Sequence, residues 1–115
     1  MRRMTEEKKT VLDWIQANEK RLSDFHQKIW HYAEPAWREY KSARAYVALL
    51  REEGFDVEEG SGKMPTAFCA TFGEGKPVLA SYAEYDCTPG NSQQAASAGQ
   101  EEHPQLPWLP FLYFL

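Results

Sequence analysis

Residues 42–60 read SARAYVALLREEGFDVEEG, and the spacing of the apolar side chains changes within this stretch. Before Gly54 they recur at the spacing of one helix face, which predicts a helix over 42–53. The residues on that face are Ala43, Val47 and Leu50. After Gly54, apolar and acidic residues alternate over 55–59, which predicts a short half-buried strand. Because Gly54 stands where a left-handed residue ends a helix, the stretch predicts a helix that passes directly into a strand.

A longer helical pattern precedes this stretch, over 5–33. Its apolar stripe consists of Val11, Ile15, Leu22, Phe25 and Ile29. The pattern leaves open whether this segment is one helix or two. Pro35 ends it, because the residue before a proline is pushed out of the helical region. The tryptophans of this half of the chain are interpreted as core or helix-packing residues: Trp14, Trp30 and Trp37.

Two further strands are predicted downstream, over 66–72 and 77–84. The second is a nearly continuous apolar run, as expected of a strand that is buried on both faces. The four-residue turn 73–76 between them predicts an antiparallel hairpin. The expected fold class is therefore α/β, with two to three helices packed on a small mixed sheet that contains a hairpin.

Composition excludes several classes of function. Thirteen Lys and Arg against seventeen Asp and Glu give a net charge of −4, which argues against a nucleic-acid partner. No apolar run approaches the roughly 20 residues that span a bilayer, and residues 1–10 are not followed by the apolar segment of a signal peptide. No membrane association is expected. Two cysteines are too few for a disulfide scaffold, so a reducing, cytoplasmic location is expected.

The strongest local sign of chemistry is the pair of carboxylates in Glu84-Tyr85-Asp86, at the end of the predicted strand 77–84. Residues i and i+2 of a strand point to the same side. Two carboxylates on one side of a strand end suit a cation or acid–base site. An ordinary solvated strand end is the alternative, because turns also attract Asp.

Six short segments stand in a characteristic order and spacing along the chain: 29–35, 39–43, 53–55, 64–68, 83–86 and 89–93. With these segments the chain resembles the amidohydrolase branch of the aminoacylase/carboxypeptidase-type dimetal metallopeptidases. Within that branch, the closest subgroup is the one similar to the B-subunit of aminobenzoyl-glutamate utilisation protein. The resemblance covers about residues 8–94.

The resemblance implies the N-terminal part of a zinc-peptidase-like catalytic domain. Such enzymes use two divalent metals, zinc or manganese, to hydrolyse amide bonds of N-acyl amino acids or dipeptide-like substrates. A smaller inserted domain makes the parent enzyme a dimer. Many relatives carry His-x-Asp where this chain has Glu84-x-Asp86, so direct metal binding by residue 84 is in doubt. Asp86 matches the motif, and Asp86 and Glu84 are the catalytic candidates; no metal ligand is assigned.

The later metal ligands and the general-base Glu of the family are expected beyond residue 94. The sequence therefore predicts two parts, a metallohydrolase fragment over 1–94 and a poorly packed tail outside the family over 95–115. His103, beside Glu101 and Glu102, is interpreted as solvated sequence rather than a metal ligand. The chain alone is expected to bind no metal stably and to be inactive. The alternative is a small non-catalytic α/β module that binds a protein partner through its apolar tail.

Overall fold

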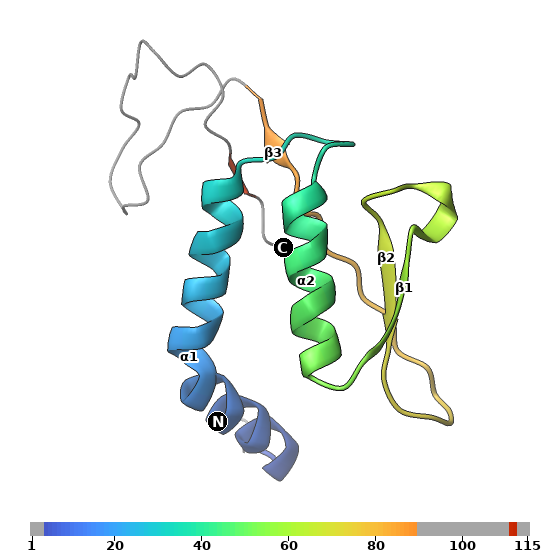
Figure 1. Cartoon of the computed structure of the whole chain (residues 1–115). Coiled ribbons are helices and arrows are strands. Elements are labelled where there is room, and N and C mark those ends of the chain that lie inside the picture. Colours follow the sequence, from blue (N-terminus) through green and yellow to red (C-terminus); the bar gives the residue numbers. More distant parts are fainter. Residues whose placement is uncertain (1–3, 90–110, 113–115) are drawn as a thin grey trace.

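The computed structural model describes residues 4–89 and 111–112. Its two long helices lie side by side, and a pair of strands lies beside the second helix (Figure 1). The elements in chain order are α1 (Glu6–Tyr32), α2 (Tyr40–Glu52), β1 (Asp56–Glu59), a 3-10 turn (Ser61–Lys63), β2 (Phe68–Thr71), β3 (Cys87–Thr88) and β4 (Phe111–Leu112). The α/β class predicted from the sequence is confirmed.

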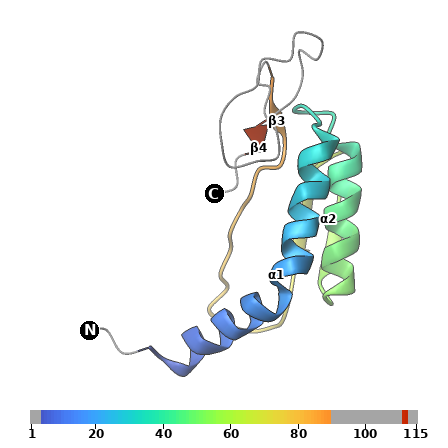
Figure 2. The same ribbon diagram turned by 90° about the vertical axis from the view of Figure 1, so that its left-hand side faces the viewer.

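Helix α1 is one element, which resolves the choice that the sequence left open, although its axis bends (Figure 2). Thr5 caps its beginning, where the side-chain oxygen accepts a hydrogen bond from the backbone N–H of Lys8 at 3.4 Å. Ala33 ends it in the left-handed region, at φ 50°. Pro35 follows two residues later, so the predicted end of this helix is confirmed.

Helix α2 begins two residues before the predicted start and ends in a Schellman motif. Gly54 has φ 87° and donates to the carbonyl of Arg51 at 3.0 Å. Phe55 donates to the carbonyl of Leu50 at 2.9 Å. These are the two hydrogen bonds that define the motif, and they turn the chain straight into β1.

Strands β1 and β2 pair antiparallel, with Val57 opposite Ala70 and Glu59 opposite Phe68. Val57 is buried, and Phe68 and Ala70 are half-buried, so these side chains form the inner face of the pair. The opposite face carries Glu58 and Cys69, which are exposed. The short strand predicted after Gly54 is confirmed.

The core lies around α2, which packs against α1 on one side and the strands on the other (Figure 1). Ile29 of α1 is its most buried apolar side chain, at 1% exposed. The ring of Tyr46 lies at its centre: its centroid is 4.8 Å from that of Phe25, 5.2 Å from that of Tyr85 and 6.2 Å from that of Phe68. These contacts join both helices, β2 and the segment before β3.

The predicted strand over 77–84 and its hairpin with 66–72 are wrong. Residues 72–86 form no strand, and Figure 2 shows this segment as an extended stretch that runs to β3. Val78, Leu79 and Tyr82 are 82%, 91% and 80% exposed. The sheet does contain a hairpin, but it joins β1 to β2. An apolar run shows that a segment can be buried in a sheet. The segment pairs as a strand only where a neighbouring strand has a free edge.

The apolar stripe of α1 is only partly buried. Phe25 and Ile29 face α2, but the stripe residues between positions 11 and 22 are exposed. These are Val11, Ile15 and Leu22, with Trp14 beside them. Trp37 is also exposed, so the packing role predicted for Trp14 and Trp37 is wrong. The described residues do not cover these apolar side chains of α1.

The prediction of a separate tail over 95–115 mostly lies outside the described residues. Two of its residues form β4, which pairs antiparallel with β3, with Leu112 opposite Cys87 and Phe111 opposite Thr88. The boundary near residue 94 therefore stays a prediction. Among the residues that the structure describes, no helix is long and apolar enough to cross a membrane.

Candidate functional site

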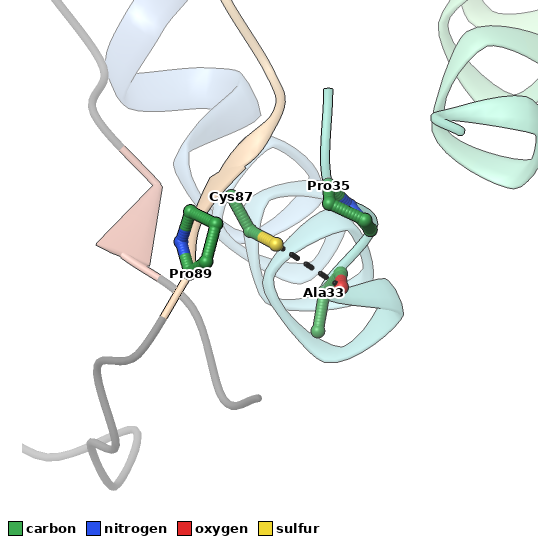
Figure 3. A pocket seen from close by; sticks show the side chains of 4 residues that line it. All are labelled: Ala33, Pro35, Cys87 and Pro89. Carbon is green, nitrogen blue, oxygen red and sulfur yellow. Dashed lines mark hydrogen bonds between the residues drawn. The ribbon is translucent and has the colours of Figure 1, made fainter. Parts of the chain in front are cut away.

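The segment that carries Asp86 is held against the linker between α1 and α2. The backbone N–H of Cys87 donates to the carbonyl of Glu34 at 2.9 Å. The Cys87 thiol donates to the carbonyl of Ala33 at 3.2 Å (Figure 3), and Pro35 and Cys87 form an isolated parallel bridge. The backbone bridge and the thiol hydrogen bond therefore both hold the chain immediately after Asp86.

The side chain of Glu34 closes the beginning of α2. One carboxylate oxygen accepts from the backbone N–H of Lys41 at 2.9 Å. The other accepts from both the N–H and the hydroxyl of Ser42, each at 2.8 Å. Ser42 is 1% exposed, so this carboxylate satisfies donors that cannot reach water. A negative charge also interacts favourably with the positive end of the helix dipole.

Sequence reasoning missed this role of Glu34. The residue lies outside α2, and its partners are seven and eight positions further on. A polar Ser42 on the otherwise apolar inner face of α2 was the available signal that a polar partner must face it. Glu39, at the capping position itself, makes no capping hydrogen bond.

A second polar chain links α2, β2 and Tyr85. The Thr66 hydroxyl donates to a carboxylate oxygen of Glu39 at 2.8 Å, and the Tyr85 hydroxyl donates to the backbone carbonyl of Thr66. Burial raises the pKa of Tyr85 to about 12, and the negative charges of Glu39, Glu34 and Asp86 add to the effect. Tyr85 therefore stays protonated at neutral pH and remains a donor.

The two predicted site residues, Asp86 and Glu84, differ in burial and in how their backbone is held. Asp86 is half-buried, between two anchored residues, Tyr85 and Cys87. Its charge contributes to the raised pKa of both neighbours. Glu84 is exposed. The predicted placement of both carboxylates on one side of a strand is wrong, because neither residue lies in a strand. Their catalytic roles stay predictions.

Within 4–89 and 111–112, no three His, Cys, Asp or Glu side chains converge as metal ligands. Glu84 and Asp86 would supply two carboxylates, whereas zinc sites use three or four protein ligands. The described residues by themselves therefore do not fit the metal centre that the resemblance implies. Glu101, Glu102 and His103 lie outside the described part.

A small cavity of about 200 Å³ lies next to this segment. Its walls are formed by Ala33, Pro35, Cys87 and Pro89 (Figure 3). The lining is almost wholly apolar, and its one polar side-chain group, the Cys87 thiol, already donates to Ala33. It provides no group that could bind the charged end of an amino acid.

We expect the two cysteines to differ strongly in reactivity. Cys69 is exposed and Cys87 is buried. Burial raises the pKa of the Cys87 thiol, which lowers the thiolate fraction near pH 8. Because the thiolate is the reactive form, Cys87 is expected to react with a thiol reagent at least about 10-fold more slowly than Cys69 in the folded protein. Labelling Cys69→Ser and Cys87→Ser variants with and without urea measures this. Equal rates in the folded state would contradict the packing described.

Comparison with known proteins gives one informative similarity. No family model and no solved structure matches the chain. Over 86 residues, or 75% of this chain, it is 42% identical to the B-subunit of p-aminobenzoyl-glutamate hydrolase from Escherichia coli (strain K12). The chain spans 18% of the length of that relative. The resemblance inferred from the sequence is therefore confirmed: three quarters of this chain is similar to a portion of that hydrolase polypeptide.

Proposed function

We propose that this chain is one part of the catalytic domain of a hydrolase that cleaves amide bonds of N-acyl amino acids or dipeptide-like compounds. The observation that carries the proposal is the 42% identity over 86 residues. The relative's name describes hydrolysis of p-aminobenzoyl-glutamate, in which an amide joins an aromatic acid to an amino acid. That compound falls within the substrate class that the sequence resemblance implies.

Asp86 is the residue through which this part would act. An alignment of 86 residues within a chain of 115 must begin at or before residue 30 and end at or after residue 86. Asp86 therefore lies within the region that is similar to the relative, and so does the linker between α1 and α2, which anchors Cys87. A carboxylate on a fixed backbone is suited to orienting a reacting group or stabilising positive charge. Glu84, which is exposed and unanchored, is the weaker candidate.

The metals implied by the resemblance, zinc or manganese, need ligands beyond Glu84 and Asp86. In this proposal the remaining ligands and the general base come from the other four-fifths of the relative's length. The described residues hold Asp86 in place and supply its negative charge. The chain alone binds no metal stably. A dimer of the whole enzyme and a cytoplasmic location complete the proposal; the location is supported by the low number of cysteines.

The alternative of a non-catalytic module that binds a partner through its tail gains no support from the described residues. Most of the tail lies outside them. The two tail residues that are described pair with β3 of the same chain.

Hydrolysis assays test the proposal that this part is inactive alone. The purified chain, with added zinc or manganese, is expected to release no p-aminobenzoate from p-aminobenzoyl-glutamate above the buffer rate. The reason is that a hydrolytic metal site needs at least three protein ligands and an open position. The complete Escherichia coli hydrolase, in which the relative is joined by its other subunit, is the positive control under the same conditions. Metal-dependent turnover that is lost in an Asp86→Ala variant would show that this chain is an enzyme on its own.

A further inference from the structure

Tyr85 is the first residue after an exposed segment that is held by the rest of the fold. Residues 73–84 are exposed, and within the described part of the chain they make no backbone-to-backbone hydrogen bond. Tyr85 is half-buried, and its ring centroid lies 5.2 Å from that of Tyr46 and 5.9 Å from that of Phe68. On the N-terminal side of Asp86, the backbone is therefore held by the side chain of Tyr85.

The hydroxyl of Tyr85 makes this anchor specific. It donates to the backbone carbonyl of Thr66, a residue that is only 7% exposed. The Thr66 hydroxyl in turn donates to Glu39 at 2.8 Å, at the beginning of α2. Burial raises the pKa of Tyr85 to about 12, so at neutral pH the hydroxyl keeps the proton that it donates. The neighbouring rings fix the plane of Tyr85, and the hydrogen bond fixes where the tip of the ring lies.

Asp86 lies between this anchor and a second one. On its C-terminal side, Cys87 is buried and bonded to the carbonyls of Ala33 and Glu34. Both anchors use partners within the described residues, so they do not depend on the other four-fifths of the relative's length. A group that acts on a reacting centre must be held within about 0.5 Å of its productive position. Two anchored neighbours are a means of holding Asp86 in this way.

We propose that Tyr85 is a positioning residue, whose hydrogen bond to the Thr66 carbonyl holds Asp86 where its carboxylate acts in hydrolysis. The role assigned to Tyr85 rests on the proposed function, in which Asp86 is the residue that acts. Tyr85 works through the backbone that it shares with Asp86, and its own hydroxyl is engaged by Thr66. Loss of such a supporting contact typically lowers activity by roughly 10- to 100-fold.

Nitrogen-15 relaxation in the chain alone tests the positioning without any substrate. The order parameter of the Asp86 amide is expected to be about 0.85, as in rigid backbone, and to fall below about 0.6 in Tyr85→Phe. That variant keeps the ring and loses only the hydroxyl. Tyr46→Phe is the matched control, because it removes the hydroxyl of the neighbouring ring and leaves the bond between Tyr85 and Thr66 in place. An order parameter that is the same in Tyr85→Phe as in the parent chain overturns the proposal.

A double-mutant cycle tests the effect on catalysis. The test protein is the Escherichia coli relative with its matched residues replaced by the 86 of this chain, produced together with the other subunit of that hydrolase. Tyr85→Phe is expected to lower kcat for p-aminobenzoyl-glutamate by about 10-fold and to leave KM within about 2-fold, whereas Tyr46→Phe should change neither. Because Tyr85 acts through Asp86, Tyr85→Phe should lower the rate no further when Asp86→Ala is already present. A full effect in that background would show a general structural role and contradict the proposal.

The two experiments separate failure of this proposal from failure of the proposed function. A folded chimera without turnover would contradict the proposed function, and the relaxation measurement would still decide whether Tyr85 holds Asp86. A chimera that loses activity with Asp86→Ala but keeps it with Tyr85→Phe would overturn the role of Tyr85 and leave the proposed function intact.

Discussion

Replacing Glu34 by alanine is expected to lower the free energy of unfolding by about 2–4 kcal/mol. The carboxylate accepts three hydrogen bonds at the beginning of α2, two of them from the buried Ser42. Hydrogen bonds to a charged group contribute more than neutral ones, and a buried donor left without a partner costs its full desolvation energy. Since small domains have a total stability of about 5–15 kcal/mol, the loss should be large in a urea titration.

Two variants control for this prediction. Glu19→Ala removes an exposed carboxylate from α1 and should shift the urea midpoint very little. Glu34→Gln keeps one acceptor oxygen but not the charge, so its loss of stability should lie between those of the other two. If Glu34→Ala unfolds at the same urea concentration as the unmodified chain, the account of how α2 begins is wrong.

Replacing Asp86 by alanine should have the largest effect on activity. The test protein is a chimera, the Escherichia coli relative with its matched residues replaced by the 86 of this chain, produced together with the other subunit of that hydrolase. We expect Asp86→Ala in this chimera to lower kcat/KM for p-aminobenzoyl-glutamate by at least about 100-fold, the usual scale for a charged group that acts on the reacting centre. The effect should appear mainly in kcat, because a group that stabilises the transition state does not set substrate affinity.

Asp56→Ala in the same chimera is the matched control. Asp56 is an exposed carboxylate on β1 and is placed away from the proposed site, so its loss should leave kcat/KM within about 3-fold of the parent chimera. If Asp86→Ala changes kcat/KM equally little in a chimera that folds normally, Asp86 is not an active-site residue.

The predictable parts of the fold are those determined by residues close together in the sequence. The Schellman motif at Gly54 uses hydrogen bonds that span three and five residues, and β1 follows from the alternation immediately after it. The end of α1 before Pro35 is equally local. Each could be predicted because backbone geometry and apolar spacing act over one or two turns.

The unpredictable parts depend on residues far apart in the sequence. The carboxylate of Glu34 caps a helix from outside it, and the backbone of Glu34 accepts from Cys87, more than fifty positions away. The pattern of 77–84 predicts a buried strand, but β2 pairs with β1, and this segment pairs with no described strand. The same error placed Glu84 and Asp86 on one side of a strand. Their roles could be inferred only from the resemblance.

In the proposed function, the described residues are a working part of an amidohydrolase catalytic domain and not a domain of separate function. Hydrolysis of p-aminobenzoyl-glutamate by the parent chimera, compared with the unmodified relative, tests this most directly. At 42% identity the exchanged part should still pack against the rest of the enzyme, so kcat/KM is expected to stay within about 10-fold of the relative. A soluble, folded chimera that shows no turnover above the buffer rate would contradict the central claim.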